Sequence, residues 1–192
     1  MNDKILRKNN CKTIYWKTGH SYIKRKVNEE NAIAGFEKSG HFFFNAPIGR
    51  GYDDGLVTAI TVCEMLEQNP GKSMADLNDS LPQSWGSPTM SPYCADTEKY
   101  EVVDRAIAHF QKCADDGKKV ARQSIRDLVT VNGIRITVED GTWGLVRASS
   151  NKPGLVVVVE SPVSEDRMRD MFAEIDNLLS SWPEVGEYDQ KL

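Results

Sequence analysis

The sequence is poor in cysteine, and no two of its cysteines stand at metal-binding spacing. The four cysteines are far apart and no CxxC motif occurs; they are Cys11, Cys63, Cys94 and Cys113. Structural zinc sites are generally built from close pairs of ligands, so this pattern argues against a zinc site. We expect four free thiols, which is typical of a protein in the reducing cytoplasm.

Long hydrophobic runs and an excess of basic residues are also missing. No apolar stretch is long enough to cross a bilayer, and the opening residues MNDKILRKNN lack the apolar segment of a secretory signal. The 192 residues carry a formal net charge of −4, whereas nucleic-acid binding needs a basic face. We therefore expect a globular cytoplasmic protein with no membrane or nucleic-acid partner.

Several motifs of nucleotide and hydrolase chemistry are absent as well. Gly71-Lys72-Ser73 resembles the end of a P-loop, but Leu66 stands where its first glycine is required. Neither GxGxxG nor GxSxG occurs in the chain. Asp53 and Asp54 precede a predicted helix, where capping is more typical than metal binding. We predict no metal site among these residues.

The first half of the chain alternates between predicted strands and helices. Residues 12–16 and 41–45 have the composition of strands, and residues 21–32 form a predicted helix with a charged face. A second helix begins near Asp53, and its apolar stripe includes Cys63, which we expect to be buried. The alternation predicts an α/β fold with a partial parallel α/β layer in this half.

A proline-containing segment, residues 81–99, predicts a connection between two domains. Beyond it, alternating apolar residues flank Asn132-Gly133, a strong signal for a β-hairpin. A final helix begins near Ser164. We predict a first domain at residues 1–92 and a second at residues 93–192, the second being a small α+β domain with an antiparallel sheet.

Hydrogen-bond donors crowd into one loop between two apolar strands of the second half. The segment RASSNKP contains Arg147, Ser149, Ser150, Asn151 and Lys152. An arginine fork can bind two phosphate oxygens, and the backbone amides of a tight turn form a concave anion site. The loop therefore suits a phosphate, although an ordinary polar turn explains the composition equally well.

Two further polar segments lie in the first half. In EKSGH, a carboxylate and a hydroxyl stand together before a predicted strand, an arrangement that suits a sugar; the alternative is an ordinary turn at a strand entry. The residues are Glu37, Lys38, Ser39, Gly40 and His41. The segment WKTGHS adds Lys17 and His20. A lone histidine is more often structural than catalytic.

Taken in order, WKTGHSYIKRK, EKSGHFFF, GRGYDDGL and GTWGLVRASSNKP resemble the alpha-D-phosphohexomutase family, most of all its bacterial phosphomannomutase/phosphoglucomutase branch. The resemblance spans nearly the whole chain. It implies a partial third domain whose sugar-reading loop corresponds to Glu37, Ser39, Gly40 and His41. It also implies a fourth domain whose distal phosphate loop, RASNTTP in the family, corresponds to residues 147–153. Ser150, Asn151 and Lys152 depart from that loop but keep a donor at each position.

The resemblance also implies parts that this sequence does not contain. The family's phosphorylated serine lies in a TASHNP-like loop and its Mg²⁺ ligands in a DGDGD-like loop, and neither run occurs here. We expect Mg²⁺ and the activator glucose 1,6-bisphosphate to act in the full-length family enzyme, with missing N-terminal mutase domains supplied in cis or trans. His20 and His41 are candidates for proton handling, and Lys17 and Lys38 for contacts to the substrate.

Two functional hypotheses follow from the sequence. The first is the C-terminal portion of a phosphohexomutase that interconverts hexose 1-phosphate and 6-phosphate of mannose or glucose through a bisphosphate, and that is inactive without its other domains. The second is a non-catalytic phosphosugar-binding module or split-gene remnant. A nucleic-acid-binding module is a distant third because the chain is acidic.

Overall fold

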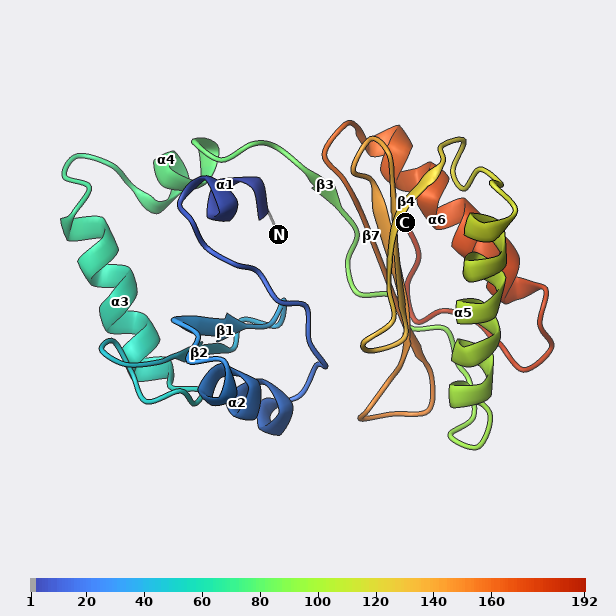
Figure 1. Cartoon of the computed structure of the whole chain (residues 1–192), viewed down its shortest axis with the longest axis horizontal. Coiled ribbons are helices and arrows are strands. Elements are labelled where there is room, and N and C mark those ends of the chain that lie inside the picture. Colours follow the sequence, from blue (N-terminus) through green and yellow to red (C-terminus); the bar gives the residue numbers. More distant parts are fainter. Residues whose placement is uncertain (1–2) are drawn as a thin grey trace. The chain divides into compact units, whose positions relative to one another are not determined.

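A computed structural model of the chain describes residues 3–192, which divide into two compact units (Figure 1). The first unit ends at Pro82, and the second is Gln83–Leu192. The first contains α1 (Asp3–Lys8), α2 (His20–Glu29), β1 (Ala34–Phe36), β2 (Phe42–Phe44), α3 (Gly55–Glu67) and α4 (Met74–Asp79). The second contains β3 (Trp85–Gly86), α5 (Lys99–Asp115), β4 (Ile125–Val129), β5 (Ile134–Val138), β6 (Trp143–Ala148), β7 (Leu155–Ser161) and α6 (Glu165–Ser180).

The core of the first unit lies between α2 and a two-stranded sheet. Ile23 and Val27 are one helical turn apart on α2 and are buried together with Phe43 of β2. Gly35 of β1 allows this close contact, since a Cβ atom there would lie 2.7 Å from Ile23. The other face of the strand pair carries a stack of aromatic rings, Phe36, Phe42 and Phe44.

The strand pairing of the first unit differs from the sequence prediction. β1 and β2 are antiparallel, with Gly35 opposite Phe43, so the observed pair is not the parallel layer that the alternation predicted. Residues 12–16, predicted as a strand, form neither helix nor strand. The short segment 37–41 joins β1 to β2 as a hairpin, and such a short connection leaves no room for the crossover that parallel strands require.

Helix α3 is well capped but poorly buried. The side chain of Asp54 accepts hydrogen bonds from the amides of Leu56 and Val57, which confirms its predicted capping role. The expectation that Cys63 is buried is wrong, because the thiol is exposed. Leu56 and Ile60, on the same stripe, are 72% and 51% exposed. The stripe exists as the periodicity predicted, but the described residues of this unit leave Leu56 and Ile60 largely uncovered.

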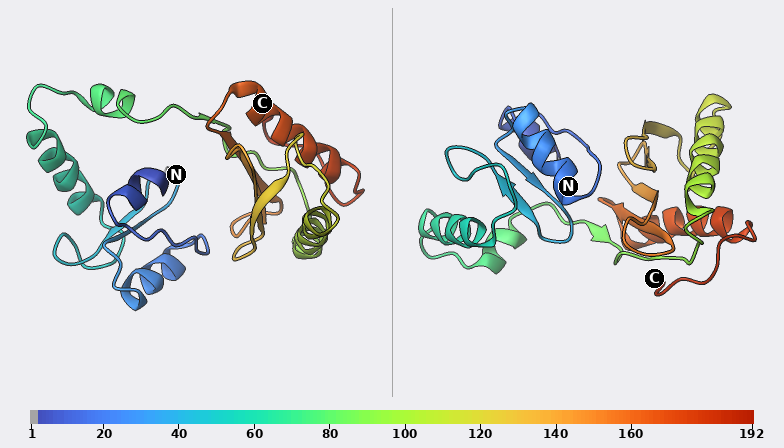
Figure 2. Two further views of the ribbon diagram at one scale, coloured as in Figure 1. Left: turned by 45° about the horizontal axis from the view of Figure 1, so that its top comes forward. Right: turned by 90° about the horizontal axis from the view of Figure 1, so that it is seen from below.

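The second unit is a five-stranded antiparallel sheet with two helices on one face (Figures 1 and 2). The strand order is β3-β7-β6-β5-β4, which confirms the predicted antiparallel α+β domain. β7 is buried at nearly every position because it lies inside the sheet and its odd-numbered residues face α5 and α6. Gly144 of β6 brings α6 close, since a Cβ atom there would lie 2.4 Å from Ile175.

The predicted local signals of the second unit are present. Asn132-Gly133 forms the β4–β5 turn, where Gly133 has φ +77° and packs so tightly that a Cβ atom would lie 2.2 Å from the carbonyl oxygen of Val146. Only glycine suits both that conformation and that contact. Ser164 caps α6 by accepting a hydrogen bond from the amide of Arg167.

The first and last segments of the second unit pair with each other. Pro92 forms an antiparallel bridge with Tyr188, and Met90 bridges to Val157 of β7. Residues 83–92 therefore belong to the second compact unit, whereas the sequence-based division placed them in the first domain. The pairing that draws them there is between residues far apart in the chain, and local composition does not reveal it.

Candidate functional site

The hairpin turn between β1 and β2 presents the polar group EKSGH at the surface. The amide of Glu37 donates to the carbonyl of His41, and the amide of Gly40 donates to the carbonyl of Glu37, each over 3.0 Å. Gly40 has φ +90° with nothing within 4 Å of an added Cβ atom, so it serves the turn rather than a packing contact. Lys38, Ser39 and His41 are exposed.

The carboxylate of Glu37 joins this turn to the segment WKTGHS. One oxygen, Oε1, accepts from the backbone amide of Gly19 over 2.8 Å, and the other, Oε2, accepts from the hydroxyl of Ser39 over 3.3 Å. Gly19 directly precedes α2, and Lys17 and His20 flank it. The structure thus brings together the two polar segments that the sequence singled out in the first half, and Glu37 is held in place from both sides.

The two histidines of this unit have different surroundings. Nδ1 of His41 lies 2.7 Å from Oδ2 of Asp53, which fixes the orientation of an otherwise exposed ring. The ring of His20 packs on buried Phe43, with ring centres 5.1 Å apart. Asp53 is a neighbour that the sequence analysis missed. Asp53 lies in GRGYDDGL, one of the motifs that supported the resemblance, and this position could have identified it as a residue of the site.

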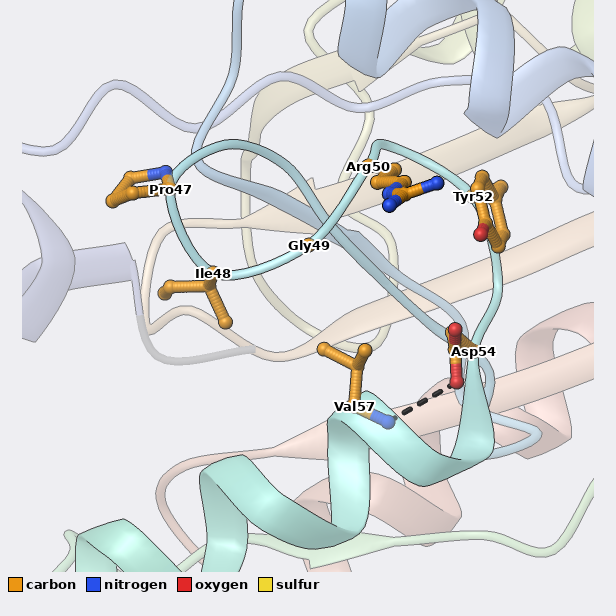
Figure 3. A pocket seen from close by; sticks show the side chains of 7 residues that line it. All are labelled: Pro47, Ile48, Gly49, Arg50, Tyr52, Asp54 and Val57. Atoms are coloured by element: carbon orange, nitrogen blue, oxygen red, sulfur yellow. Dashed lines mark hydrogen bonds between the residues drawn. The ribbon is translucent and has the colours of Figure 1, made fainter.

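A shallow cavity of about 370 Å³ lies where the GRGYDDGL loop enters α3 (Figure 3). Arg50 extends toward Tyr52 on one side of this loop, while Ile48 and Val57 face each other on the other. The carboxylate of Asp54 is engaged with α3 and caps it. The cavity contains none of the predicted binding residues.

In the second unit, the loop RASSNKP joins β6 to β7 as predicted. The amide of Ser149 donates to the carbonyl of Gly154 over 3.0 Å, and this closes the loop at its base. Ser149 is buried and its hydroxyl accepts weakly, over 3.4 Å, from the amide of Asn151. Ser150, Asn151 and Lys152 are exposed. The loop therefore presents outward the three residues that differ from the family's loop sequence.

Beneath this loop lies Lys99, the first residue of α5. Its side chain is only 6% exposed, and its Nζ donates to the carbonyl of Ser149 over 2.6 Å and to that of Lys152 over 3.4 Å. The third partner is the carboxylate of Asp96 at 2.6 Å. A cavity of about 320 Å³ is lined by Lys99, Asp96 and Lys152 together with Tyr100, Ser150, Asn151 and Pro153. Sequence analysis missed Lys99 because an isolated lysine at a helix start carries no signal of burial.

The end of the chain reaches the same loop. Nζ of Lys152 lies 3.0 Å from Oδ2 of Asp189, whose other oxygen accepts from the amides of Ser91 and Gln190. Partial burial alone would raise the pKa of the Asp189 carboxyl, but the donors from Ser91 and Lys152 outweigh it and hold the pKa below its usual range. The pair is about half exposed, so its contribution to stability is small.

Arg147, at the end of β6, is directed along the loop. Its guanidinium donates to the carbonyl of Ala148 over 3.0 Å. The predicted binding residues thus form two groups: Lys17, His20 and residues 37–41 in the first unit, and residues 147–152 in the second.

Residues 3–192 contain neither a metal-binding cluster nor a membrane-spanning helix. No group of three or more His, Cys, Asp or Glu side chains in this part of the chain is arranged to hold a metal ion. No helix within it is long and apolar enough to cross a membrane.

The chain matches known protein families in two consecutive segments. Residues 1–85 match "Phosphoglucomutase/phosphomannomutase, alpha/beta/alpha domain III", and residues 96–178 match "Phosphoglucomutase/phosphomannomutase, C-terminal domain". The first segment contains the polar group around Glu37, and the second contains the loop that begins at Arg147.

Individual relatives agree with these matches. A phosphomannomutase/phosphoglucomutase of Pseudomonas syringae pv. tomato is 30% identical over 165 residues, which cover 86% of this chain and 32% of that protein. A phosphoglucomutase of Neisseria meningitidis is 28% identical over 185 residues, 93% of this chain and 37% of that protein. The crystal structure of a phosphoglucomutase/phosphomannomutase family protein from Burkholderia thailandensis superposes with a TM-score of 0.75 at 26% identity, covering 93% of this chain and 34% of that one. The chain spans about a third of the length of these relatives.

Proposed function

Because both matched segments come from one family, the chain belongs to the phosphoglucomutase/phosphomannomutase family, and we propose that it supplies the sugar-binding and distal phosphate-binding part of a phosphohexomutase. The whole enzyme, an isomerase, interconverts hexose 1-phosphate and 6-phosphate of mannose or glucose through a bisphosphate. The observation that carries the proposal is the closed, donor-rich loop of residues 147–152, held outward in the segment that matches the family's C-terminal domain.

The loop is suited to an anion that is recognised without regard to the sugar attached to it. Arg147 offers a planar fork of N–H groups for two phosphate oxygens. Ser150 and Asn151 add neutral donors, and Lys152 adds a charge. A mutase must bind the phosphate at either end of a bisphosphate, and a loop that reads only the phosphate meets that requirement.

The turn around Glu37 is suited to the sugar hydroxyls. A carboxylate has about four acceptor positions, and Gly19 and Ser39 use two of them. The remaining positions can accept from two neighbouring hydroxyls, and their places are set because Glu37 is already held. When the bisphosphate turns over, the O3 and O4 hydroxyls roughly exchange places. The same contacts then serve both orientations and both hexoses, which differ at C2.

His20 and His41 are proposed to handle protons or to contact phosphate at this site. Histidine exchanges protons near neutral pH, and Asp53 orients the ring of His41. Lys17 and Lys38 lie in the same two segments and suit contacts to a charged substrate. The chemistry itself belongs to a phosphorylated serine and Mg²⁺ in the whole enzyme. Residues 3–192 offer no group of side chains that fits this metal, so in this proposal its ligands belong to the N-terminal domains.

A chemical-shift titration tests the two binding groups separately. The chain is titrated with glucose 1-phosphate, mannose 1-phosphate and inorganic phosphate. Arg147→Ala should weaken all three ligands by roughly ten- to a hundredfold, since a charge-assisted contact is worth about 1.5–3 kcal/mol. Glu37→Gln should weaken only the two hexose phosphates, because inorganic phosphate has no sugar hydroxyls.

Matched controls are available in each unit. Arg169→Ala removes an exposed arginine from α6, and Glu29→Gln changes an exposed carboxylate at the end of α2; both should leave the titrations unchanged. Intact phosphate-induced shifts around residues 149–152 in Arg147→Ala would show that the loop is only a polar turn.

The alternative, a non-catalytic phosphosugar-binding module or split-gene remnant, makes the same binding prediction but differs in activity. The chain is assayed for turnover of glucose 1-phosphate with Mg²⁺ and a trace of glucose 1,6-bisphosphate, alone and with a separately produced N-terminal portion of a relative. Turnover only in the mixture favours the mutase portion. Binding without turnover in either case favours the module.

A further inference from the structure

We propose that Lys99 is a positioning residue that sets the phosphate-binding loop from beneath, by turning the carbonyls of Ser149 and Lys152 inward and the amide of Ser150 outward. This inference rests on the proposed function of residues 147–152 and extends it to a residue outside the loop. Three observations carry it: the burial of the ammonium group, the number of its acceptors and the geometry of the peptide unit that it contacts.

Burial of an ammonium group is unfavourable unless every donor finds an acceptor. The Lys99 side chain is 6% exposed, and its three N–H donors have three oxygen partners. Two of these partners are loop carbonyls, of Ser149 and Lys152, rather than carboxylates. A lysine needed only to cap α5 or to pair with Asp96 would have no reason to lie under a loop fifty residues away along the chain.

The contact with Ser149 fixes the direction of an amide donor. In a trans peptide the carbonyl and the following N–H point in opposite directions. The Ser149–Ser150 bond is trans, since the one cis bond within residues 3–192 is Ala46–Pro47. With the Ser149 carbonyl drawn to Lys99, the amide of Ser150 points away from α5. Ser150 is exposed, so that donor is available to an anion.

The contact with Lys152 fixes the other end of the loop. Its carbonyl also points to Lys99, and the next residue, Pro153, has no N–H to offer. The exposed residues Ser150 and Asn151 thus lie between the carbonyls of Ser149 and Lys152, both of which accept from Lys99. A loop ordered in advance binds more tightly than one that must be ordered on binding, and the buried positive charge adds to the attraction for phosphate.

The test is a titration of the full chain with inorganic phosphate, followed through the amides of residues 149–152. Lys99→Met keeps the length of the side chain and removes its charge and donors. We expect its dissociation constant for phosphate to rise about tenfold, the usual effect of one charge-assisted hydrogen bond, and the Ser150 amide to lose its wild-type chemical shift before any ligand is added.

Two variants separate positioning from a general loss of stability. Asp96→Asn removes the ion pair of Lys99 but leaves both carbonyl contacts, so it should bind phosphate at least as tightly as the wild type even if its melting temperature falls. Lys112→Met removes an exposed lysine elsewhere on α5 and should alter neither quantity. An equal loss of phosphate affinity in Asp96→Asn and Lys99→Met would overturn the positioning role.

The outcomes also separate this inference from the function on which it rests. Absence of any phosphate response in the wild type would overturn the proposed function, and this role with it. A wild-type response that is unchanged in folded Lys99→Met would overturn this role alone. If Lys99→Met does not fold, a measurement on the wild type replaces it. The hydrogen bond from Nζ of Lys99 to the carbonyl oxygen of Ser149 should give a scalar coupling between that nitrogen and the carbonyl carbon. Absence of this coupling would refute the proposal.

Discussion

The two units of this chain differ in how much of their apolar surface they bury. The second unit has a continuous core of twenty buried residues between its sheet and two helices. The described residues of the first unit form a core of three, Ile23, Val27 and Phe43, and leave large apolar side chains such as Leu56 and Ile60 in solvent. Stability comes mainly from apolar burial, so the second unit has the means to fold alone and the first does not.

The same difference separates the two candidate binding groups. The loop at Arg147 lies on a sheet that is fixed by its own core. The turn at Glu37 lies on a strand pair that is covered on one face, and isolated two-stranded sheets are marginal in water. Phosphate binding should therefore survive conditions in which sugar binding is lost.

The largest expected effect comes from separating the units. Residues 83–192 alone should unfold in one cooperative transition, whereas residues 1–82 alone should show weak amide protection and no sharp transition. Circular dichroism melting and hydrogen exchange measure both. In the whole chain, limited proteolysis should cut near residues 80–83, before the segment that pairs with β7. Equal amide protection and equal protease resistance of the two units would refute the idea that the second unit is the more stable one.

The next largest effect comes from matched truncations of two helical isoleucines. Ile175→Ala, in the core of the second unit, should cost about 2–5 kcal/mol of unfolding free energy, because Ile175 is fully buried against β6. Ile60→Ala on α3 should cost less than about 0.5 kcal/mol. Denaturant unfolding gives both values. Similar losses at the two positions would mean that α3 is covered in solution.

A smaller effect concerns the acid stability of the second unit. Hydrogen bonds from Arg122 and then from Arg167 hold the pKa of Asp170 below its usual range. A depressed carboxyl pKa adds stability above the unfolded value of about 3.9 and loses it as the pH falls through the lower folded value. Asp170→Asn should therefore cost about 1–2 kcal/mol at pH 7.

The same variant should unfold with less dependence on pH than the wild type. Urea melts at pH 7, 5, 4 and 3 test this. The free-energy difference between the two proteins should stay constant down to about pH 5 and shrink below pH 4. A difference that persists unchanged at pH 3 would assign the cost of the substitution to packing rather than to charge.

The smallest effect on stability comes from Ile60→Lys, which places a charge on the exposed stripe of α3. The unfolding free energy should change by less than about 0.5 kcal/mol, while self-association should decrease, because exposed apolar patches favour association. Sedimentation velocity at several concentrations measures the self-association, with Lys72→Ala as a control outside the stripe. Equal self-association of Ile60→Lys and Lys72→Ala would show that the apolar stripe of α3 is not the surface through which the chain associates.

Local signals in the sequence predicted the local parts of this structure. Gly133 requires a positive φ, and Ser164 caps α6 through a contact within three residues, so each could be recognised from its neighbours. The loops at Glu37 and Arg147 were located by their composition and by their order along the chain. These features need no information about the rest of the fold.

What the sequence did not predict depends on distant contacts. Periodicity shows that α3 has an apolar stripe but not whether anything covers it, which is why Cys63 was misplaced. The direction of β1 relative to β2 follows from a hairpin whose first strand was not recognised. Lys99 contacts Ser149, fifty positions away, and Asp189 contacts Lys152, thirty-seven positions away. A single sequence has no pattern that pairs residues so far apart.

The paired ends of the second unit have a mechanical consequence. The amide of Ser91 donates to Asp189, which also accepts from Lys152, and the carbonyl of Pro92 accepts from the amide of Leu155, the first residue of β7. A tension applied to the chain where it enters this unit would therefore reach the C-terminal side of the loop through one or two hydrogen bonds. We therefore expect tension on the entry segment to change the affinity of this loop for the phosphate that we propose it binds.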